Sequence, residues 1–317
     1  MILRDPVHGL VAFEGADEAL ALALLGTREV QRLRRVRQLG LTSLVFPGAE
    51  HSRFAHAIGA AHVMTRLRER VRAKEGDLPD ALRLTDQAAL DALAAAFLHD
   101  LGHGPYSHLF EEVVPAARPH EEWTVQALLD PGTEVHQALR SIDAGMPERV
   151  AALVTGESAV GWLARAVSGT LDVDRCDYLL RDSHMTGVAY GIYDLDWLLR
   201  ALAFAELPFG DTASDRWVLA IEGRKGLPPI EGFFLARHFM YQQVYHHKAT
   251  RAAECIVRAM FSRVARLVSE GAPPTPLPRA LGEAITGREQ RLGDYLELCL
   301  LYTSSSALTD ITSQVSR

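Results

Sequence analysis

Histidine is the side chain best suited both to binding a metal ion and to moving protons near neutral pH. It is concentrated in one stretch of this 317-residue chain, where seventy residues hold seven of the thirteen histidines: His51, His56, His62, His99, His103, His108 and His120. Within the stretch, His99 and Asp100 close a helical apolar pattern that Gly102 and Pro105 then interrupt. A helix C-terminus carries partial negative charge, and the pair supplies one nitrogen and one oxygen ligand, which suits Mn, Fe, Zn or Mg.

Two further side chains could complete a metal site with this pair. His56 continues the apolar stripe of residues 60–67, so we expect it to point into the core, where a single histidine is more often a structural residue than a ligand. Asp174 shares a helical face with Leu171 and Tyr178, and burying a carboxylate is unfavourable unless it is paired or holds a metal. A structural Asp–Arg pair would explain Asp174 by itself. Together with the His-Asp pair, these residues favour a metal site.

Groups suited to acid–base chemistry and to phosphate binding accompany this set. His103, His108 and Glu111 follow the His-Asp pair within twelve positions, although a solvated polar loop is the alternative. Basic, aromatic and amide side chains recur over residues 237–248, which suits phosphate and a flat base or sugar. The polar face of an amphipathic helix is the alternative there.

Mostly helical elements must position these groups. Apolar periodicity predicts helices within residues 29–38, 60–67, 90–101, 123–129, 194–203 and 232–268. The β-like run 217–221 follows the turn-rich segment 210–215, which predicts a small hairpin inserted between helices, and a second weak strand pair flanks residues 5–9. The sequence therefore predicts a single, mainly α-helical domain.

The composition narrows the class of protein. With 48% apolar and 23% charged residues the chain is typical of globular proteins, and the net charge of −7 provides no general attraction for nucleic acid. No apolar run is long enough for a membrane span, and the N-terminus does not resemble a secretory signal, so we expect a cytoplasmic protein. Three widely spaced cysteines form neither a disulfide framework nor a zinc knuckle. Residues 299–317 are expected to be a non-native or disordered tail after a truncated domain, a natural polar tail being the alternative.

The order His56, His99-Asp100, Asp174 resembles the metal set of the HD-domain phosphohydrolases, and in particular their deoxynucleoside triphosphate triphosphohydrolase branch, which includes dGTPase-like and SAM-and-HD-domain enzymes. The resemblance covers nearly the whole chain through residues 5–9, 31–34, 38–40, 46–49, 53–56, 97–111, 173–178 and 245–248. It implies an HD-domain helical fold over residues 1–298 with a metal core at about 50–185.

The resemblance also implies an activity, which is hydrolysis of a dNTP (dGTP or more broadly) to a deoxynucleoside and inorganic triphosphate. One divalent metal (Mn, Fe, Mg or Zn) would be held by His56, His99, Asp100 and Asp174, with additional Mg brought by the nucleotide. The implied catalytic residues are His103, His108, Glu111 and His120, with His108 as candidate proton donor. The implied substrate contacts are Arg53, Arg175 and Lys248 for the triphosphate, Gln38 and Asp182 for the 3′-hydroxyl, Tyr178 and Tyr245 beside the sugar, and Arg237.

Two departures and two alternatives accompany this interpretation. Glu111 stands where the mammalian branch has a shorter aspartate, and Gly26 stands where allosterically regulated members carry an acidic residue, so no activator site is carried over. A homo-oligomer, dimer or tetramer, is expected from the resemblance. The alternatives are an HD-type phosphatase or phosphodiesterase acting on another nucleotide, and a catalytically silent nucleotide-sensing module. Base preference, the physiological metal and activation by nucleotides stay open.

Overall fold

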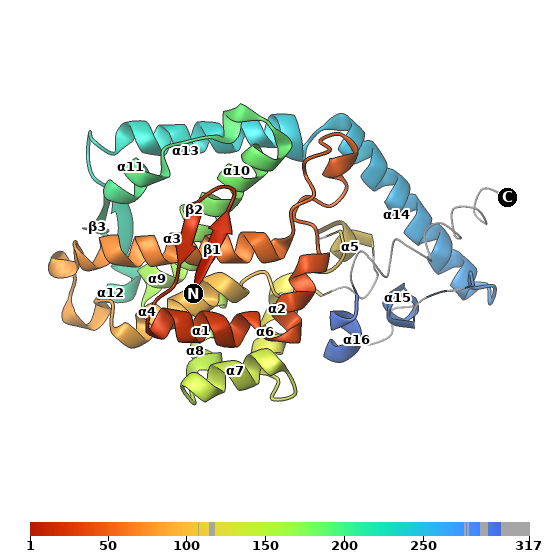
Figure 1. Ribbon diagram of the computed structural model, residues 1–317, viewed down its shortest axis with the longest axis horizontal. Helices are drawn as coiled ribbons and strands as arrows, with labels where there is room; N and C mark the ends of the chain where they lie inside the picture. Colours follow the sequence, from red (N-terminus) through yellow and green to blue (C-terminus); the bar gives the residue numbers. More distant parts are fainter. Residues whose placement is uncertain (107, 114–117, 276, 278, 286–290, 299–317) are drawn as a thin grey trace.

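Helices dominate the computed structural model, which describes residues 1–106, 108–113, 118–275, 277, 279–285 and 291–298 (Figure 1). The predicted tail, 299–317, lies outside the described residues. In chain order the elements are β1 (Ile2–Asp5), β2 (Gly9–Ala12), α1 (Ala16–Leu25), α2 (Arg28–Arg32), α3 (Arg53–Arg72), α4 (Asp86–Leu98), α5 (His108–Val113), α6 (His120–Leu129), α7 (Glu134–Ile142), α8 (Met146–Thr155), α9 (Gly161–Val167), α10 (Val173–Thr186), α11 (Leu195–Arg200), β3 (Leu202–Glu206), α12 (Ala213–Arg216), β4 (Trp217–Ile221), α13 (Leu227–Met240), α14 (Lys248–Ser269), α15 (Arg279–Ile285) and α16 (Leu292–Leu296). The predicted mainly α-helical fold is confirmed.

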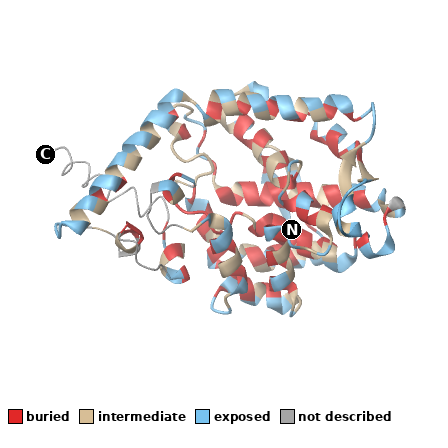
Figure 2. Ribbon diagram, turned by 180° about the vertical axis from the view of Figure 1, so that it is seen from behind, coloured by how far each residue is buried: buried red, intermediate tan, exposed pale blue. Residues whose placement is uncertain are grey.

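The helices α3 and α4 lie in the middle of the molecule, with buried residues on several of their faces (Figure 2). In α4, every residue from Ala92 to Leu98 is buried, and a helix that is apolar all round belongs inside a protein. Alanine makes up much of this helix, so neighbouring helices can approach it closely. α3 contacts both α4 and α10, and this packing fixes the helices that carry the predicted ligands.

Hydrogen-bonding side chains define where these three helices begin. Ser52 precedes α3, Thr85 precedes α4 and Asp172 precedes α10, and each side chain accepts a hydrogen bond from a backbone N–H in the first turn. Such N-caps satisfy backbone donors that the helix leaves unpaired. They therefore set the register in which His56, four residues after its cap, and Asp174, two residues after its cap, face the centre.

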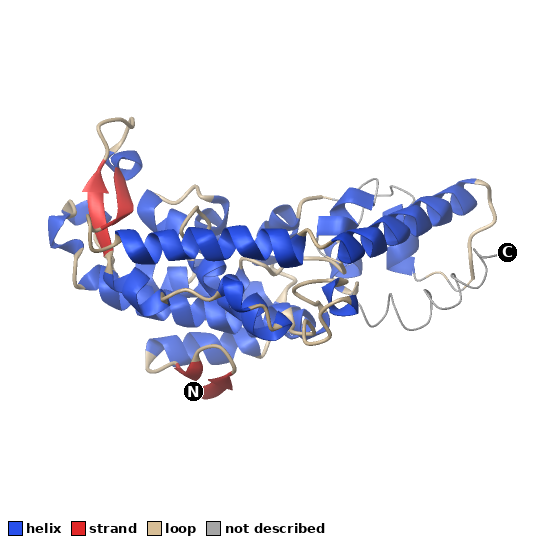
Figure 3. Cartoon of the chain, turned by 90° about the horizontal axis from the view of Figure 1, so that it is seen from above, coloured by secondary structure: helices blue, strands red, loops and turns tan. Residues whose placement is uncertain are grey.

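Both predicted strand pairs are present as antiparallel two-stranded sheets (Figure 3). In the first, Ile2 pairs with Ala12; in the second, Leu202 pairs with Ile221. The helix predicted over 194–203 is wrong at its end, because α11 stops at Arg200 and the following residues form β3. Pairing with β4 outweighs the helical pattern there.

Two longer predicted helices are interrupted. The pattern over 29–38 gives α2 followed by a 3₁₀ turn at Leu33–Arg35, and the pattern over 232–268 is divided by a π-helical turn at Tyr241–Tyr245. Such π turns often occur at functional sites, and this one carries Tyr245 toward α10. Beyond it, α14 extends away from the body (Figures 1 and 3). No helix among the described residues combines the length and apolar character needed to cross a membrane.

Candidate metal centre and adjoining pocket

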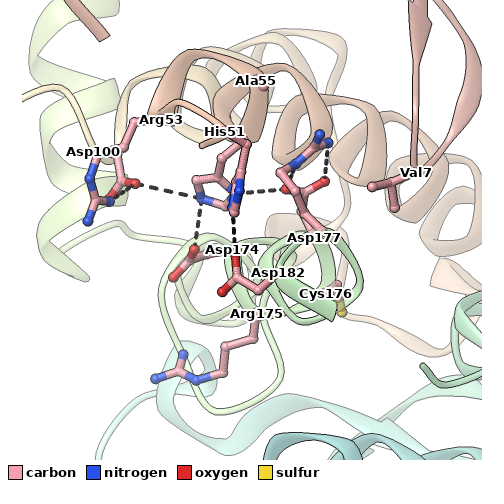
Figure 4. Close-up of polar contacts among 12 residues, drawn as sticks. Val7, His51, Arg53, Ala55, Asp100, Asp174, Arg175, Cys176, Asp177 and Asp182 are labelled. Carbon is pink, nitrogen blue, oxygen red and sulfur yellow. Dashed lines mark hydrogen bonds and ion pairs between the residues drawn. The ribbon is translucent and has the colours of Figure 1, made fainter. Parts of the chain in front are cut away.

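Donor atoms from α3, from the turn that follows α4 and from the start of α10 converge at one place. Asp174 Oδ1 lies 3.0 Å from His56 Nε2 and 3.5 Å from His99 Nε2, and the two Nε2 atoms are 3.3 Å apart. Asp100 closes the other side, with its carboxylate oxygens 3.7 Å from His56 Nε2 and 3.6 Å from His99 Nε2. Figure 4 shows Asp100 and Asp174 approaching the same centre from different elements. The structure thus brings all four predicted ligands together.

The two histidines present the same nitrogen to this centre because their other nitrogens are engaged. His99 Nδ1 lies 3.0 Å from the carbonyl oxygen of Ala96, and His56 Nδ1 lies 2.8 Å from Asp177 Oδ2. Each contact fixes a proton on Nδ1 and leaves the Nε2 lone pair for a ligand. Two imidazoles and two carboxylates that converge in this way fit a divalent cation of the Mn, Fe, Zn or Mg type.

The pKa values of these residues are shifted because charged groups lie close together in a buried place. Burial opposes protonation of His56, but hydrogen bonds to Asp174 and Asp177 prevail and raise its pKa to about 10, so a cation that binds at Nε2 replaces a proton there. Although burial favours the neutral acid, Arg53 and His99 hold the pKa of Asp100 well below its usual value. The side chain of Asp174 is 29% exposed, less buried than the sequence predicts, because it opens onto the neighbouring pocket.

A second group of side chains adjoins the first through Asp100. His103 Nε2 lies 3.2 Å from Asp100 Oδ1, and the His103 ring stacks on that of His120 with centroids 3.6 Å apart. His120 Nδ1 lies 2.9 Å from Glu111 Oε1, and His108 Nδ1 lies 3.7 Å from Glu111 Oε2. Burial and the nearby Arg53 charge lower the pKa of His103, which is therefore neutral. The four predicted catalytic residues form one continuous chain of contacts.

Beside the two groups lies a pocket of about 430 Å³. Its lining includes six of the predicted substrate residues together with Asp174 and His108: Gln38, Arg53, Arg175, Tyr178, Asp182 and Tyr245. Lys248 and Arg237 are not among the lining residues; Lys248 is exposed at the start of α14, and the Arg237 guanidinium lies 4.8 Å from the ring centre of Tyr241, which does line the pocket.

The polar residues that line the pocket differ in how many hydrogen-bond partners they already have within the protein. Gln38 Oε1 is buried without a hydrogen-bond partner, so it is available to a ligand hydroxyl. Asp182 accepts from His51 Nε2 and from the Tyr245 hydroxyl, both at 2.8 Å. Arg175 contacts Asp172 and the carbonyl of Gly169 and so faces the pocket with part of its guanidinium.

Sequence reasoning assigned no role to several residues that the structure places around the centre. Asp177 contacts His56 directly, His8 contacts Asp177, and His51 contacts Asp182. Tyr106 lines the pocket with a positive φ of 63°, an uncommon conformation for a residue other than glycine. The one available signal was the four-residue spacing of Asp177 and Arg181, typical of an ion pair on one helix face.

The comparisons agree with this geometry. Residues 53–180 match the family model of the HD domain. The chain is 37% identical, over 94% of its length, to the uncharacterized protein YwfO of Bacillus subtilis, and it is 28% identical, over 82% of its length, to the deoxynucleoside triphosphate triphosphohydrolase SAMHD1 of Danio rerio. The chain is also similar to a solved phosphohydrolase from Bacteroides thetaiotaomicron, with a TM-score of 0.77 and 29% identity. The match covers all of this chain and 72% of the phosphohydrolase chain.

The fold, the His/Asp cluster and the family model thus agree that residues 53–180 form an HD domain. The matched range runs from the start of α3 into α10 and includes all four candidate ligands. The chain covers 63% of the Bacillus subtilis relative and 44% of the Danio rerio relative, less than two thirds of either protein.

Proposed function

We propose that the chain is a metal-dependent phosphohydrolase that cleaves a deoxynucleoside triphosphate into the deoxynucleoside and inorganic triphosphate. The observation that carries the proposal is the convergence of donor atoms from His56, His99 and Asp174 at the wall of a 430 Å³ pocket. The similarity to a protein named as a deoxynucleoside triphosphate triphosphohydrolase supports the substrate class. The aromatic and basic lining of the pocket suits a nucleotide.

The proposed ligands of a single divalent ion are His56, His99, Asp100 and Asp174, and the ion is Mn, Fe, Mg or Zn. When bound, it supplies Lewis acidity toward a phosphoryl oxygen. An additional Mg is proposed to arrive with the nucleotide. Arg53 and Arg175 neutralise charge on the triphosphate, which is the main requirement of phosphoryl transfer.

Proton transfer is assigned to the chain of contacts that ends at His108. His108 lines the pocket, and its contact with Glu111 raises its pKa, so it is suited to protonate the leaving 5′-oxygen. Glu111 is in turn contacted by His120, which stacks on His103. In this arrangement Glu111 keeps His108 charged, and the two stacked imidazoles fix Glu111.

Recognition of the sugar is assigned to a further set of residues that line the pocket. Gln38 has an unpartnered oxygen, and Asp182 keeps free lone pairs beyond its two hydrogen bonds, so both can accept from the 3′-hydroxyl. Tyr178 and Tyr245 pack against the sugar. Arg237 and Lys248 stand outside the lining; Lys248 reaches the triphosphate, and Arg237 reaches another part of the substrate, only if their side chains move. We place this activity in residues 1–298, with a metal core at about 50–185, in a cytoplasmic homo-oligomer.

The test is a product analysis with each of the four dNTPs in the presence of Mn or Mg, carried out in water enriched in ¹⁸O. Chromatography is expected to yield deoxynucleoside and triphosphate in equal amounts, and mass spectrometry is expected to find the label in the triphosphate, since attack at the α-phosphorus leaves the 5′-oxygen on the sugar. Release of orthophosphate or a monophosphate would instead identify a different phosphohydrolase. Binding without turnover would identify a nucleotide-sensing module.

A further inference from the structure

A fully buried carboxylate, Asp177, lies on the side of His56 that faces away from Asp174. Asp177 Oδ2 accepts from His56 Nδ1 at 2.8 Å, and Oδ1 accepts from His8 Nε2 at 2.7 Å. Arg181 adds two hydrogen bonds through Nε and Nη2, at 2.8 and 2.9 Å. Figure 4 shows Asp177 across the histidine side chains from Asp100. Four donors from three parts of the chain therefore hold one carboxylate against one ligand histidine.

The N-terminal turn between β1 and β2 is built to deliver His8 to this place. Asp5 Oδ1 accepts hydrogen bonds from the backbone N–H groups of Val7 and His8, both at 2.9 Å, which fixes the turn. Asp5 Oδ2 accepts from Arg181 Nη1 at 2.9 Å, so the turn is also tied to α10. His8 and Asp177 are 169 positions apart, and their contact exists only in the folded chain.

A glycine in α3 provides the space for this network. A Cβ atom at Gly59 would lie 1.9 Å from Asp177 Oδ1 and 2.3 Å from Arg181 Nη2, too close for any side chain. Gly59 stands in the middle of a 20-residue helix, where glycine is unfavourable by about 0.5–1 kcal/mol relative to alanine. The helix thus accepts a local loss of stability at the position where the Asp177–Arg181 pair packs against its backbone.

From these contacts we infer that Asp177 is the positioning residue of His56, and that His8 and Arg181 hold Asp177 in place for that purpose. The inference rests on the proposed metal site. A carboxylate that accepts from Nδ1–H fixes the ring orientation and the tautomer of a ligand histidine and strengthens its Nε2 as a donor. His99 obtains the same restraint from the Ala96 carbonyl within its own helix. A purely structural Asp177–Arg181 pair would require neither His8 nor His56.

The test measures metal binding directly rather than through turnover. Asp177→Asn keeps the shape of the side chain but removes its charge, and His8→Gln removes one of its supports. The affinity for Mn²⁺ is measured by competition with a chelator, and the visible absorption of bound Co²⁺ reports on ligand geometry. We expect roughly 10- to 100-fold weaker binding and an altered Co²⁺ spectrum for Asp177→Asn, with a smaller change of the same kind for His8→Gln.

The matched control is His136→Gln, which also removes a buried histidine but one whose Nδ1 contacts the Leu128 carbonyl outside the site. It is expected to change thermal stability and leave Mn²⁺ affinity and the Co²⁺ spectrum as in the wild type. If folded Asp177→Asn and His8→Gln bind metal as the wild type does, the positioning role is wrong and the metal site stands. If Asp177→Asn does not fold, His8→Gln alone decides.

The test also separates this inference from the proposed activity. A wild-type protein that binds neither Mn²⁺ nor Co²⁺ overturns the metal site and the positioning role together. A wild-type protein that binds metal but cleaves no dNTP overturns only the substrate, and weaker binding by Asp177→Asn would then still support the role of Asp177.

Discussion

The Tyr245 hydroxyl donates a 2.8 Å hydrogen bond to one oxygen of Asp182, while His51 Nε2 lies 2.8 Å from the other oxygen. Tyr245 comes from the π-helical turn after α13, and His51 comes from the segment before α3. Two distant segments therefore fix one carboxylate at the pocket wall. A carboxylate restrained in this way can distinguish a ligand that offers a hydroxyl from one that does not.

Asp182→Asn tests this recognition of the 3′-hydroxyl. The amide has a single acceptor oxygen, so it cannot serve both existing donors and a ligand hydroxyl as well. We expect kcat/KM for a dNTP to fall roughly tenfold or more, and the preference for a dNTP over the matching 2′,3′-dideoxy analogue to disappear. Glu254→Gln, in the same pocket, is the control and should keep that preference. A preference retained by Asp182→Asn would show that another group reads the hydroxyl.

Asp174→Ala tests the proposed ligand set. Asp174 Oδ1 lies 3.0 Å from His56 Nε2 and 3.5 Å from His99 Nε2, so its loss leaves both nitrogens without their shared oxygen donor. We expect Mn²⁺ binding, measured by calorimetry, and dNTP turnover to be lost together. Asp86→Asn removes a carboxylate that is 98% exposed and should alter neither. Turnover that survives in Asp174→Ala would remove Asp174 from the site.

The pH dependence of turnover tests the assignment of the proton donor. The 3.7 Å ion-pair contact with Glu111 raises the pKa of His108, although the imidazole is largely exposed. A general acid must carry its proton, so turnover is expected to fall as the pH rises through that pKa. Glu111→Gln removes the stabilising charge, and the alkaline limb of the profile should move to lower pH. An unchanged limb would mean that His108 is not the donor.

Much of this site was predictable because its ligands carry local signals. His99 and Asp100 end a strongly periodic helix, and the structure places that end where the pattern indicates. His56 and Asp174 were assigned only in combination with that pair and through the resemblance to a family, since each by itself has an ordinary structural explanation. Their convergence depends on the packing of α3 against α4 and α10, which no local pattern specifies.

The residues that the sequence did not assign act through long-range contacts. Asp177 lies on the same helix as Asp174, yet nothing nearby in sequence indicates that its partners are His8 and His56. The continuous helix predicted over residues 232–268 is interrupted for a similar reason, because the π-helical turn is supported by the contact of Tyr245 with Asp182. In both cases tertiary contacts outweigh local propensity.

His62 gives the fold an acid-sensitive component. Burial, with the nearby charges of His8 and Arg66, lowers its pKa to about 4, whereas in an unfolded chain it titrates near 6.5. Between these values the unfolded state binds a proton that the folded state does not, so this contribution to stability decreases as the pH falls from about 6.5 to 4. Because the side chain is partly exposed, we expect its share of the loss between pH 7 and 5 to be about 1 kcal/mol. In urea unfolding, the free energy of unfolding of His62→Gln should decrease correspondingly less between pH 7 and 5 than that of the wild type.

Gly59→Ala tests the close approach of α3 to the Asp177–Arg181 pair. The added methyl group has no space, so the carboxylate or the helix must shift, and such overpacking typically costs about 1–3 kcal/mol. The matched control is Gly232→Ala in α13, where nothing lies within 4 Å of the new Cβ and the higher helix propensity of alanine should raise stability by about 0.5–1 kcal/mol. Urea unfolding followed by circular dichroism is therefore expected to give opposite signs for the two variants. Stabilisation by both substitutions would contradict the packing of Asp177 against Gly59.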